Sequence, residues 1–249
     1  MIKFFRHIRQ NLLAEGKTGK PALPAGRYFK YAIGEIVLVV IGILIALQIN
    51  NWNESRKQKQ NLKVVYNIII NDLEKDYIEI DSILFNLKKR EGVLDKVISK
   101  TLTKEYLLTH PAATNMMTGY PDFSIQTRGY ELLKNIILTE NNLTNDLDSE
   151  ISNFYKTNLL EIKLDQDFLS EELKENYTHW KSTYSWWPDY VDDVITEDFV
   201  DYAISSQDFR NRVATFRMTL FRLYAPKLKE FQNESKILID KINLELNQK

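Results

Sequence analysis

Residues 32–49 read AIGEIVLVVIGILIALQI, and this stretch decides the architecture of the chain. Its 18 residues span about 27 Å as an α-helix, which is close to the thickness of the hydrocarbon layer of a bilayer. Strongly polar side chains occur only near its two ends, at Glu35 and Gln48. Because residues 36–47 are apolar or glycine on every side, we predict a transmembrane helix over residues 31–50.

Two other interpretations of this stretch fit less well. A buried helix of a soluble core usually shows some polar periodicity, which residues 36–47 lack. A cleaved signal peptide would have a basic region of about thirty residues, and no small-x-small cleavage site follows Leu47. Aromatic residues flank the stretch, as expected at the level of the lipid headgroups, and these interface anchors are Tyr28, Tyr31 and Trp52. An uncleaved signal anchor is the better prediction.

The formal net charge of −1 hides a basic head and an acidic body. Residues 1–53 hold seven Lys and Arg and only two Asp and Glu. Seven basic residues precede the apolar stretch and four follow it closely, so the positive-inside bias places the N-terminus in the cytoplasm and residues 53–249 outside it. An acidic body offers no basic face for the phosphates of nucleic acid, and we expect no such partner.

The first thirty residues form a basic head and a linker. Ile2, Phe5, Ile8 and Leu12 share one helical face with basic residues around it, which suits a helix lying on the inner leaflet. A head that only sets the topology explains the same residues equally well. Residues 14–27 contain Gly and Pro throughout and are typical of a linker. The predicted organisation is therefore a cytoplasmic head at 1–30, a transmembrane helix at 31–50 and an extracytoplasmic helical domain at 51–249.

The domain after the apolar stretch shows helical periodicity. Apolar residues recur at three- and four-residue spacing in three segments, which run from Leu62 to Ile98, from Leu147 to Leu173 and from Phe209 to Ile242. Ser205 to Asp208 form a capping sequence before the third segment, Pro226 should kink it, and residues 128–139 add a shorter helix. Residues 109–127 and 177–205 are expected to be irregular connections.

These patterns predict an all-α fold. No Gly or Pro lies between Asn50 and Leu87, so the transmembrane helix should continue without a break into the first helix of the domain. Long amphipathic helices cannot bury their apolar stripes alone, and we expect them to pack as an antiparallel bundle.

Residues 31–54, YAIGEIVLVVIGILIALQINNWNE, resemble the signature of a family of uncharacterised bacterial membrane proteins. Members of that family open with a short basic segment, here MIKFFRHIRQNLL, and continue with this anchor and a helical domain of unknown function. A looser likeness occurs at residues 208–211, DFRN. The resemblance implies a single-pass protein of the bacterial inner (cytoplasmic) membrane, and it implies no catalytic residues.

Glu35 is an ionisable residue inside the hydrocarbon boundary, and such residues are often functional. At 100° per residue, the positions within about 40° of Glu35 are Val39, Gly42, Ala46 and Ile49. Gly42 and Ala46 form a small-xxx-small pair that permits close approach of another helix. One hypothesis is that this face contacts a partner helix, identical or different. The other is that Glu35 extends to the headgroups and has no further role.

Residues 177–190, YTHWKSTYSWWPDY, hold three of the four tryptophans. Clustered aromatic residues on a loop can bind a sugar, a peptide or a partner surface. Here the candidates are Trp180, Trp186, Trp187 and Tyr190. The alternative is that these rings cap one end of the bundle. The acidic residues that follow lack the spacing of a calcium-binding loop.

The sequence contains no recognisable catalytic or metal-binding motif. There is no cysteine, the three histidines lie far apart, and no zinc-ligand spacing, phosphate loop or nucleophile elbow occurs. We therefore expect no enzyme, no metal and no cofactor. The predicted function is a membrane-anchored helical interaction module or accessory subunit of an envelope complex. Its partners would be the lipid bilayer and a protein or a second copy that contacts the membrane helix. The alternative is an extracytoplasmic ligand- or glycan-binding protein that uses residues 177–190.

Overall fold

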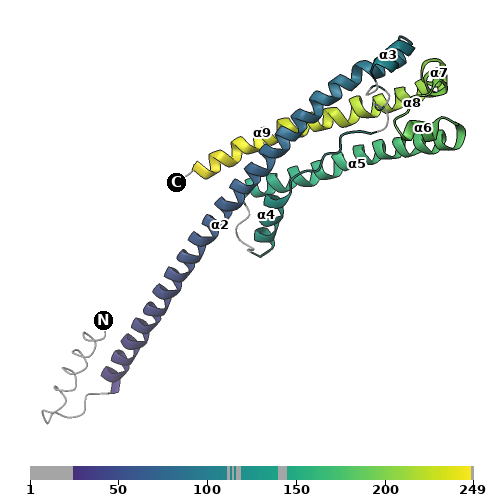
Figure 1. Cartoon of the computed structure of the whole chain (residues 1–249). Helices are drawn as coiled ribbons and strands as arrows, with labels where there is room; N and C mark the ends of the chain where they lie inside the picture. The colour runs from purple at the N-terminus through teal and green to yellow at the C-terminus, as the bar shows by residue number, and fades with distance from the viewer. Residues whose placement is uncertain (1–24, 111–112, 114, 116–118, 140–144, 248–249) are drawn as a thin grey trace. The chain divides into compact units, whose positions relative to one another are not determined.

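The computed structural model describes residues 25–110, 113, 115, 119–139 and 145–247, with side chains from residue 32 onward (Figure 1). The predictions for the basic head and for most of the linker concern residues outside this set. The described residues form helices and no strand, which confirms the all-α fold. The elements are α2 (Ala25–Ile98), α3 (Lys104–Thr109), α4 (Arg128–Thr139), α5 (Asp146–Thr183), α6 (Trp187–Val191), α7 (Glu197–Ser205), α8 (Gln207–Met218), the π-helix η2 (Thr219–Tyr224) and α9 (Ala225–Asn247).

The chain divides into two compact units, Met1–Lys59 and Gln60–Lys249. The division lies nine residues beyond the predicted end of the apolar segment at residue 50. Helix α2 contributes residues to both units, and its unbroken course from Ala25 to Ile98 confirms the prediction of a continuous helix. The absence of Gly and Pro over residues 50–87 permits this length, since both residues weaken a helix interior.

In the first unit, the side chains from Ala32 to Ile49 are all exposed. The most apolar 18-residue window has a mean hydropathy of 2.6, and none of it is buried. In water this surface would be strongly unfavourable, because removing apolar area from water is the main favourable term in folding. By length and composition α2 is able to span a membrane, a property that it shares with signal sequences.

In the second unit, α2 lies antiparallel to the last helices of the chain. Lys63 Nζ donates a hydrogen bond to the Leu246 carbonyl oxygen. Further along α2, Gln232 Nε2 donates to the Tyr77 carbonyl oxygen over 3.1 Å. Near the end of α2, Arg217 pairs with Asp95 at 2.7 Å. Contacts that advance along one helix while they recede along the other define an antiparallel pair.

Helix α5 is also antiparallel to the last helices. Asn158 Nδ2 donates to Glu234 Oε2 over 3.1 Å, and His179 Nε2 lies 3.1 Å from Asp208 Oδ2. The second half of α2, helix α5 and the run α8–η2–α9 therefore form a three-helix bundle. This confirms the prediction that the long helices pack as a bundle; α2 and α5, each antiparallel to the last helices, run parallel to each other.

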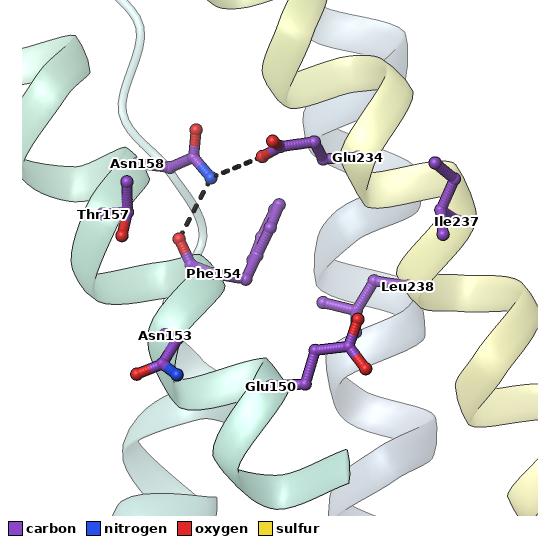
Figure 2. Close-up of a pocket in the computed structure, with 8 residues that line it drawn as sticks. All are labelled: Glu150, Asn153, Phe154, Thr157, Asn158, Glu234, Ile237 and Leu238. Carbon is purple, nitrogen blue, oxygen red and sulfur yellow. Dashed lines mark hydrogen bonds between the residues drawn. The ribbon is translucent and has the colours of Figure 1, made fainter. Parts of the chain in front are cut away.

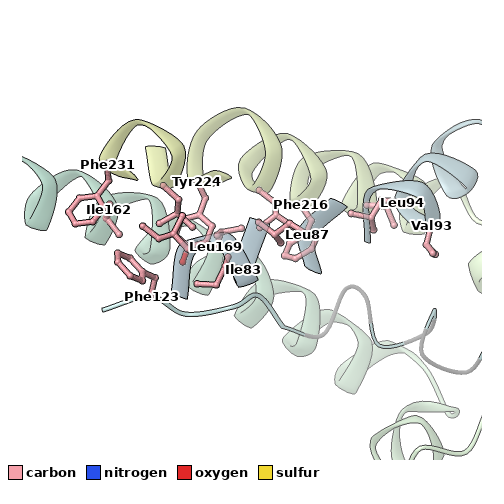
Figure 3. Packing of buried hydrophobic residues seen from close by; sticks show 14 of the residues in the cluster. Ile83, Leu87, Val93, Leu94, Phe123, Ile162, Leu169, Phe216, Tyr224 and Phe231 are labelled. Atoms are coloured by element: carbon pink, nitrogen blue, oxygen red, sulfur yellow. The ribbon is translucent and has the colours of Figure 1, made fainter. Parts of the chain in front are cut away.

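The core of the bundle consists of the apolar stripes that face one another (Figure 3). Leu87 of α2 lies close to Phe216 of α8, with Ile83 and Leu94 on either side of it along the core, and Ile162 of α5 lies beside Phe231 of α9. Burial of each such side chain contributes about 1.5–3 kcal/mol relative to exposure. A few stripe residues lie at the margin of the core and remain partly exposed, and these are Tyr77, Leu159 and Leu223.

The π-helix η2 lies immediately before Pro226. Proline has no N–H, and its ring collides with the carbonyl of the residue four positions earlier in a regular α-helix. Here the Ala225 N–H bonds to the Leu220 carbonyl, five residues back. The expected irregularity at Pro226 thus takes the form of one wide turn between α8 and α9.

The prediction that residues 177–205 are irregular is wrong. Helix α5 continues to Thr183, and α6 and α7 occupy much of the remainder. The Thr196 side chain caps α7 by accepting a hydrogen bond from the Phe199 N–H. Pro188 stands in the first turn of α6, a position that tolerates proline because its missing N–H would have no helical partner there. Aromatic and proline residues had suggested a loop, whereas local capping and burial favour helices.

Candidate functional site

The candidate face of the membrane segment lies on one side of α2. Glu35, Val39, Gly42, Ala46 and Ile49 are all helical and all exposed. A Cβ atom added at Gly42 would meet no atom within 4 Å. The contact of this face with a partner helix stays a prediction.

Of the three interface anchors, Trp52 is the one whose side chain the structure describes. It is 63% exposed, and the Arg56 guanidinium lies 5.9 Å from the centre of its ring. Such a cation–π pair holds an amphipathic ring beside a basic group, as suits a membrane–water interface. Tyr28 and Tyr31 lie in α2, and their side chains are outside the described set.

Three of the four aromatic candidates at residues 177–190 are core residues. Trp180, Trp186 and Tyr190 are 1%, 3% and 6% exposed. Trp180 Nε1 donates a hydrogen bond to the Tyr202 hydroxyl over 3.0 Å. These three rings pack in the end of the bundle, and of the four candidates only Trp187 is half-buried and reaches the surface.

A polar cluster centred on Asp208 secures this end of the bundle. Its Oδ2 atom accepts hydrogen bonds from the Tyr202 hydroxyl at 2.6 Å and from Arg212 Nε at 3.1 Å. Burial alone would raise the pKa of Asp208, but these donors outweigh burial and lower the pKa. Because His179 also lies against Asp208, the cluster joins α5, α7 and α8. Its components were not predicted to meet, since they are spread over more than thirty residues.

A surface pocket of about 590 Å³ lies beside Trp187, and we call it the Trp187 pocket. The remaining lining residues come from one face of α5, and they are Ser170, Leu173, Lys174, Tyr177, Thr178 and Lys181. The sequence suggested the aromatic part of this site through Trp187. It did not suggest Lys181, because the end of α5 was expected two turns earlier, and no local pattern placed Lys174 beside Trp187.

A second pocket of about 370 Å³, the α5–α9 groove, lies between those two helices (Figure 2). It is lined by Glu150, Asn153, Phe154, Thr157, Asn158, Glu234, Ile237 and Leu238. In Figure 2 the Phe154 ring lies between the Asn158–Glu234 hydrogen bond and Glu150. The groove therefore has an apolar floor with a carboxylate toward either end. An exposed apolar stripe continues along α5, where Leu160, Leu164 and Phe168 are 62%, 49% and 60% exposed.

Two buried carboxylates of α2 hold the segment that leads into α4. Asp72 Oδ2 accepts the Gly129 N–H at 2.8 Å, and both oxygens of Asp76 accept the Gln126 N–H at 3.1 and 3.2 Å. Carboxylates favour the N-terminus of a helix because its first N–H groups lack helical partners. Nearby in the core, the Tyr155 hydroxyl has no hydrogen-bond partner among the described residues. The sequence could have indicated these two buried carboxylates, because they fall at core positions of the apolar stripe of α2.

Asp76 makes the bundle sensitive to pH. Burial raises its pKa from 3.8 to about 7; Glu79 and Asp72 add to the rise, whereas the Gln126 N–H and Lys75 oppose it. Since the folded state keeps a proton that the unfolded chain releases, stability should fall as pH rises from about 4 to 7. The Asp76→Asn variant should reduce the stability difference between pH 5 and pH 8 by on the order of 2 kcal/mol. Urea unfolding at both pH values measures this, and an unchanged difference would contradict it.

Part of the chain is similar to a known protein family. Residues 35–108 match the model of a family of unknown function (DUF6090). No curated protein matches the chain, and no solved structure matches it. Among the described residues, no three His, Cys, Asp or Glu side chains are grouped as metal ligands would be. Over most of α2 and most of α3, the chain is thus similar to a family whose function is unknown.

Proposed function

We propose that this protein is a membrane-anchored helical interaction module that binds another protein of the cell envelope and performs no catalysis. The observation that carries the proposal is the fully exposed apolar surface of residues 32–49. Lipid tails can cover an apolar surface of this length and composition and remove it from water. The bundle has a core of its own, so the segment does not contribute to its stability. The module would be a single-pass protein of the bacterial inner membrane.

The basic residues support one orientation in this proposal. Seven Lys and Arg lie before the apolar segment and four shortly after it, so residues 1–30 would lie in the cytoplasm and the bundle outside it. The face with Glu35, Gly42 and Ala46 would be available to a partner helix within the bilayer, identical or different.

The α5–α9 groove is the proposed contact for the partner protein. After Phe154 of the groove, Leu160, Leu164 and Phe168 recur at four-residue spacing along α5, which matches the apolar face of another helix. Glu234 lines the groove and has no ion pair among the described residues, whereas Glu150 beside it is paired with Lys241. Glu171 and Glu175 follow the stripe on the same side of α5, and their ion pairs with Lys174 and Arg212 are long, at 3.7 and 4.0 Å. Charge complementarity therefore favours a basic amphipathic helix of the partner.

A synthetic probe tests the groove directly. An amphipathic peptide of about 18 residues built from Leu and Lys should bind the full chain in detergent micelles, and a Leu and Glu peptide of the same pattern should not. The Leu164→Ser/Ile237→Ser variant should weaken binding about tenfold, since it removes two exposed apolar contacts. The control variant Ile78→Ser/Phe85→Ser changes two side chains of α2 that are still more exposed than Leu164 and Ile237, and it should bind as the wild type does.

Purification from detergent-solubilised membranes extends the test to the natural partner. A protein that co-purifies with the wild type and with the α2 control, and is lost with the groove variant, would support the proposal. Recovery of the wild-type chain alone as a monomer would count against the proposal. The same would follow if both variants reduced the affinity for the Leu and Lys peptide equally.

A further inference from the structure

The Trp187 pocket is built by two elements that the chain brings together through a tight connection. Six of its residues recur at three- and four-residue spacing on α5, from Ser170 to Lys181. Trp187, the first residue of α6, supplies the remaining wall. These residues are separate from those of the α5–α9 groove, so an inference about the pocket goes beyond the interaction proposed above.

Trp187 is a rigid platform. Its ring centre lies 5.5 Å from that of Tyr177 and 5.8 Å from that of Tyr190, with the second pair stacked at 27°. The buried rings of Trp180 and Trp186 lie 6.1 and 6.4 Å away. A ring fixed by aromatic neighbours on several sides loses little conformational entropy when a ligand packs against it. Its half-exposed surface therefore suits the apolar face of a flat or cyclic ligand.

The charged groups that line the pocket are cations. Lys174 and Lys181 both line it, and no carboxylate does. Lys174 has Glu171 at 3.7 Å, and both side chains are about three-quarters exposed, so this ion pair is weak. Lys181 forms no ion pair within the described part of the chain. Two such ammonium groups in an otherwise acidic domain attract an anion locally.

Hydroxyl groups complete the lining. Ser170 and Thr178 stand on the same face of α5 as the lysines, and the Thr178 hydroxyl donates to the Lys174 carbonyl over 2.8 Å, which leaves its lone pairs available as acceptors. An aromatic platform, hydroxyls and cations together match a ligand with an apolar ring face, several hydroxyls and a negative charge. We propose that the Trp187 pocket binds an anionic saccharide, with one sugar ring against Trp187 and its carboxylate or sulfate group beside Lys174 and Lys181.

The test uses the full chain in detergent micelles and two sugars of equal length. A uronic-acid tetrasaccharide should bind and change the tryptophan fluorescence, and its affinity should fall with added salt. A neutral galactose tetrasaccharide should bind at least about tenfold more weakly, because it lacks the groups that pair with the lysines. Isothermal titration calorimetry gives both affinities without depending on fluorescence.

Matched variants assign the effect to the pocket. The Lys174→Gln/Lys181→Gln variant should bind the uronic-acid sugar about tenfold more weakly. The control Lys156→Gln/Lys163→Gln removes the same charge elsewhere on α5 and should change the affinity less than about twofold. The Trp187→Phe variant keeps an aromatic ring in place. Its circular dichroism spectrum should match that of the wild type, while its affinity for both sugars should fall.

Three results would overturn the proposal: no binding of the charged sugar at millimolar concentration, equal binding of the neutral sugar, or equal weakening by the two lysine variants. None of these measurements requires a protein partner, so failure here and failure of the interaction module are separate outcomes.

Discussion

Replacement of Gly129 by valine should destabilise the bundle by about 4 kcal/mol, near the upper end of effects for single substitutions. A Cβ atom at this position would lie 2.6 Å from Ile69 Cγ1, 2.7 Å from Ile69 N and 2.9 Å from Ile69 Cα. Two of these are backbone atoms of α2, which cannot move aside as the end of a side chain can. Displacement of α4 would also break the Gly129–Asp72 hydrogen bond and leave a buried carboxylate without its donor, a further cost.

Urea unfolding followed by circular dichroism measures this loss. Gly92→Ala is the matched control, because a Cβ atom there meets nothing within 4 Å and the residue lies inside α2. That substitution should stabilise the bundle by about 0.5–1 kcal/mol, since alanine is the better helix former. If Gly129→Val unfolds with wild-type stability, the close packing of α4 on α2 is incorrect.

Two arginines in the middle of the apolar segment should abolish membrane insertion. The segment contains twelve Ile, Leu and Val residues, each of which favours insertion by about 0.3–0.6 kcal/mol, whereas one central arginine opposes it by about 2.5–3.5 kcal/mol. In the Val40→Arg/Leu44→Arg variant the opposing terms should equal or exceed the favourable ones. The wild type should remain in the membrane pellet after alkaline carbonate washing, and the variant should not.

The control for this experiment is Val40→Leu/Leu44→Ile, which keeps the segment apolar and should stay in the pellet. Release of the wild type by carbonate would contradict the anchor, as would retention of the arginine variant. A reporter at the C-terminus that is active only in the cytoplasm should be silent in the wild type, which tests the orientation separately.

Much of the secondary structure was predictable because it depends on local rules. The helix at 128–139 and the cap at Ser206 agree with the sequence, since periodicity and capping act over a single turn or two. The end of α5 was not predictable in this way. Residues 177–183 contain aromatic and β-branched side chains with no strong local preference for helix, and burial of Trp180 in the bundle favours the extra turns.

In the candidate sites too, the sequence indicated which residues take part, and packing determined how they are arranged. Trp180, Trp186, Trp187 and Tyr190 form a cluster by sequence, but only the packing of α5, α6 and α7 decides which rings are buried. Asp72 and Asp76 occupy core positions of a helix that was predicted correctly. Their partners lie about fifty residues further along the chain, and no local rule pairs residues at that separation.

The apolar segment and the helical class are thus properties of the sequence alone. They follow from hydropathy and from a periodicity that each helix carries by itself. The tertiary structure decided which aromatic rings are core, which carboxylates lose their water and where Lys174 and Lys181 meet Trp187. These outcomes depend on distances between residues far apart in the chain, and such distances are set only when the helices pack.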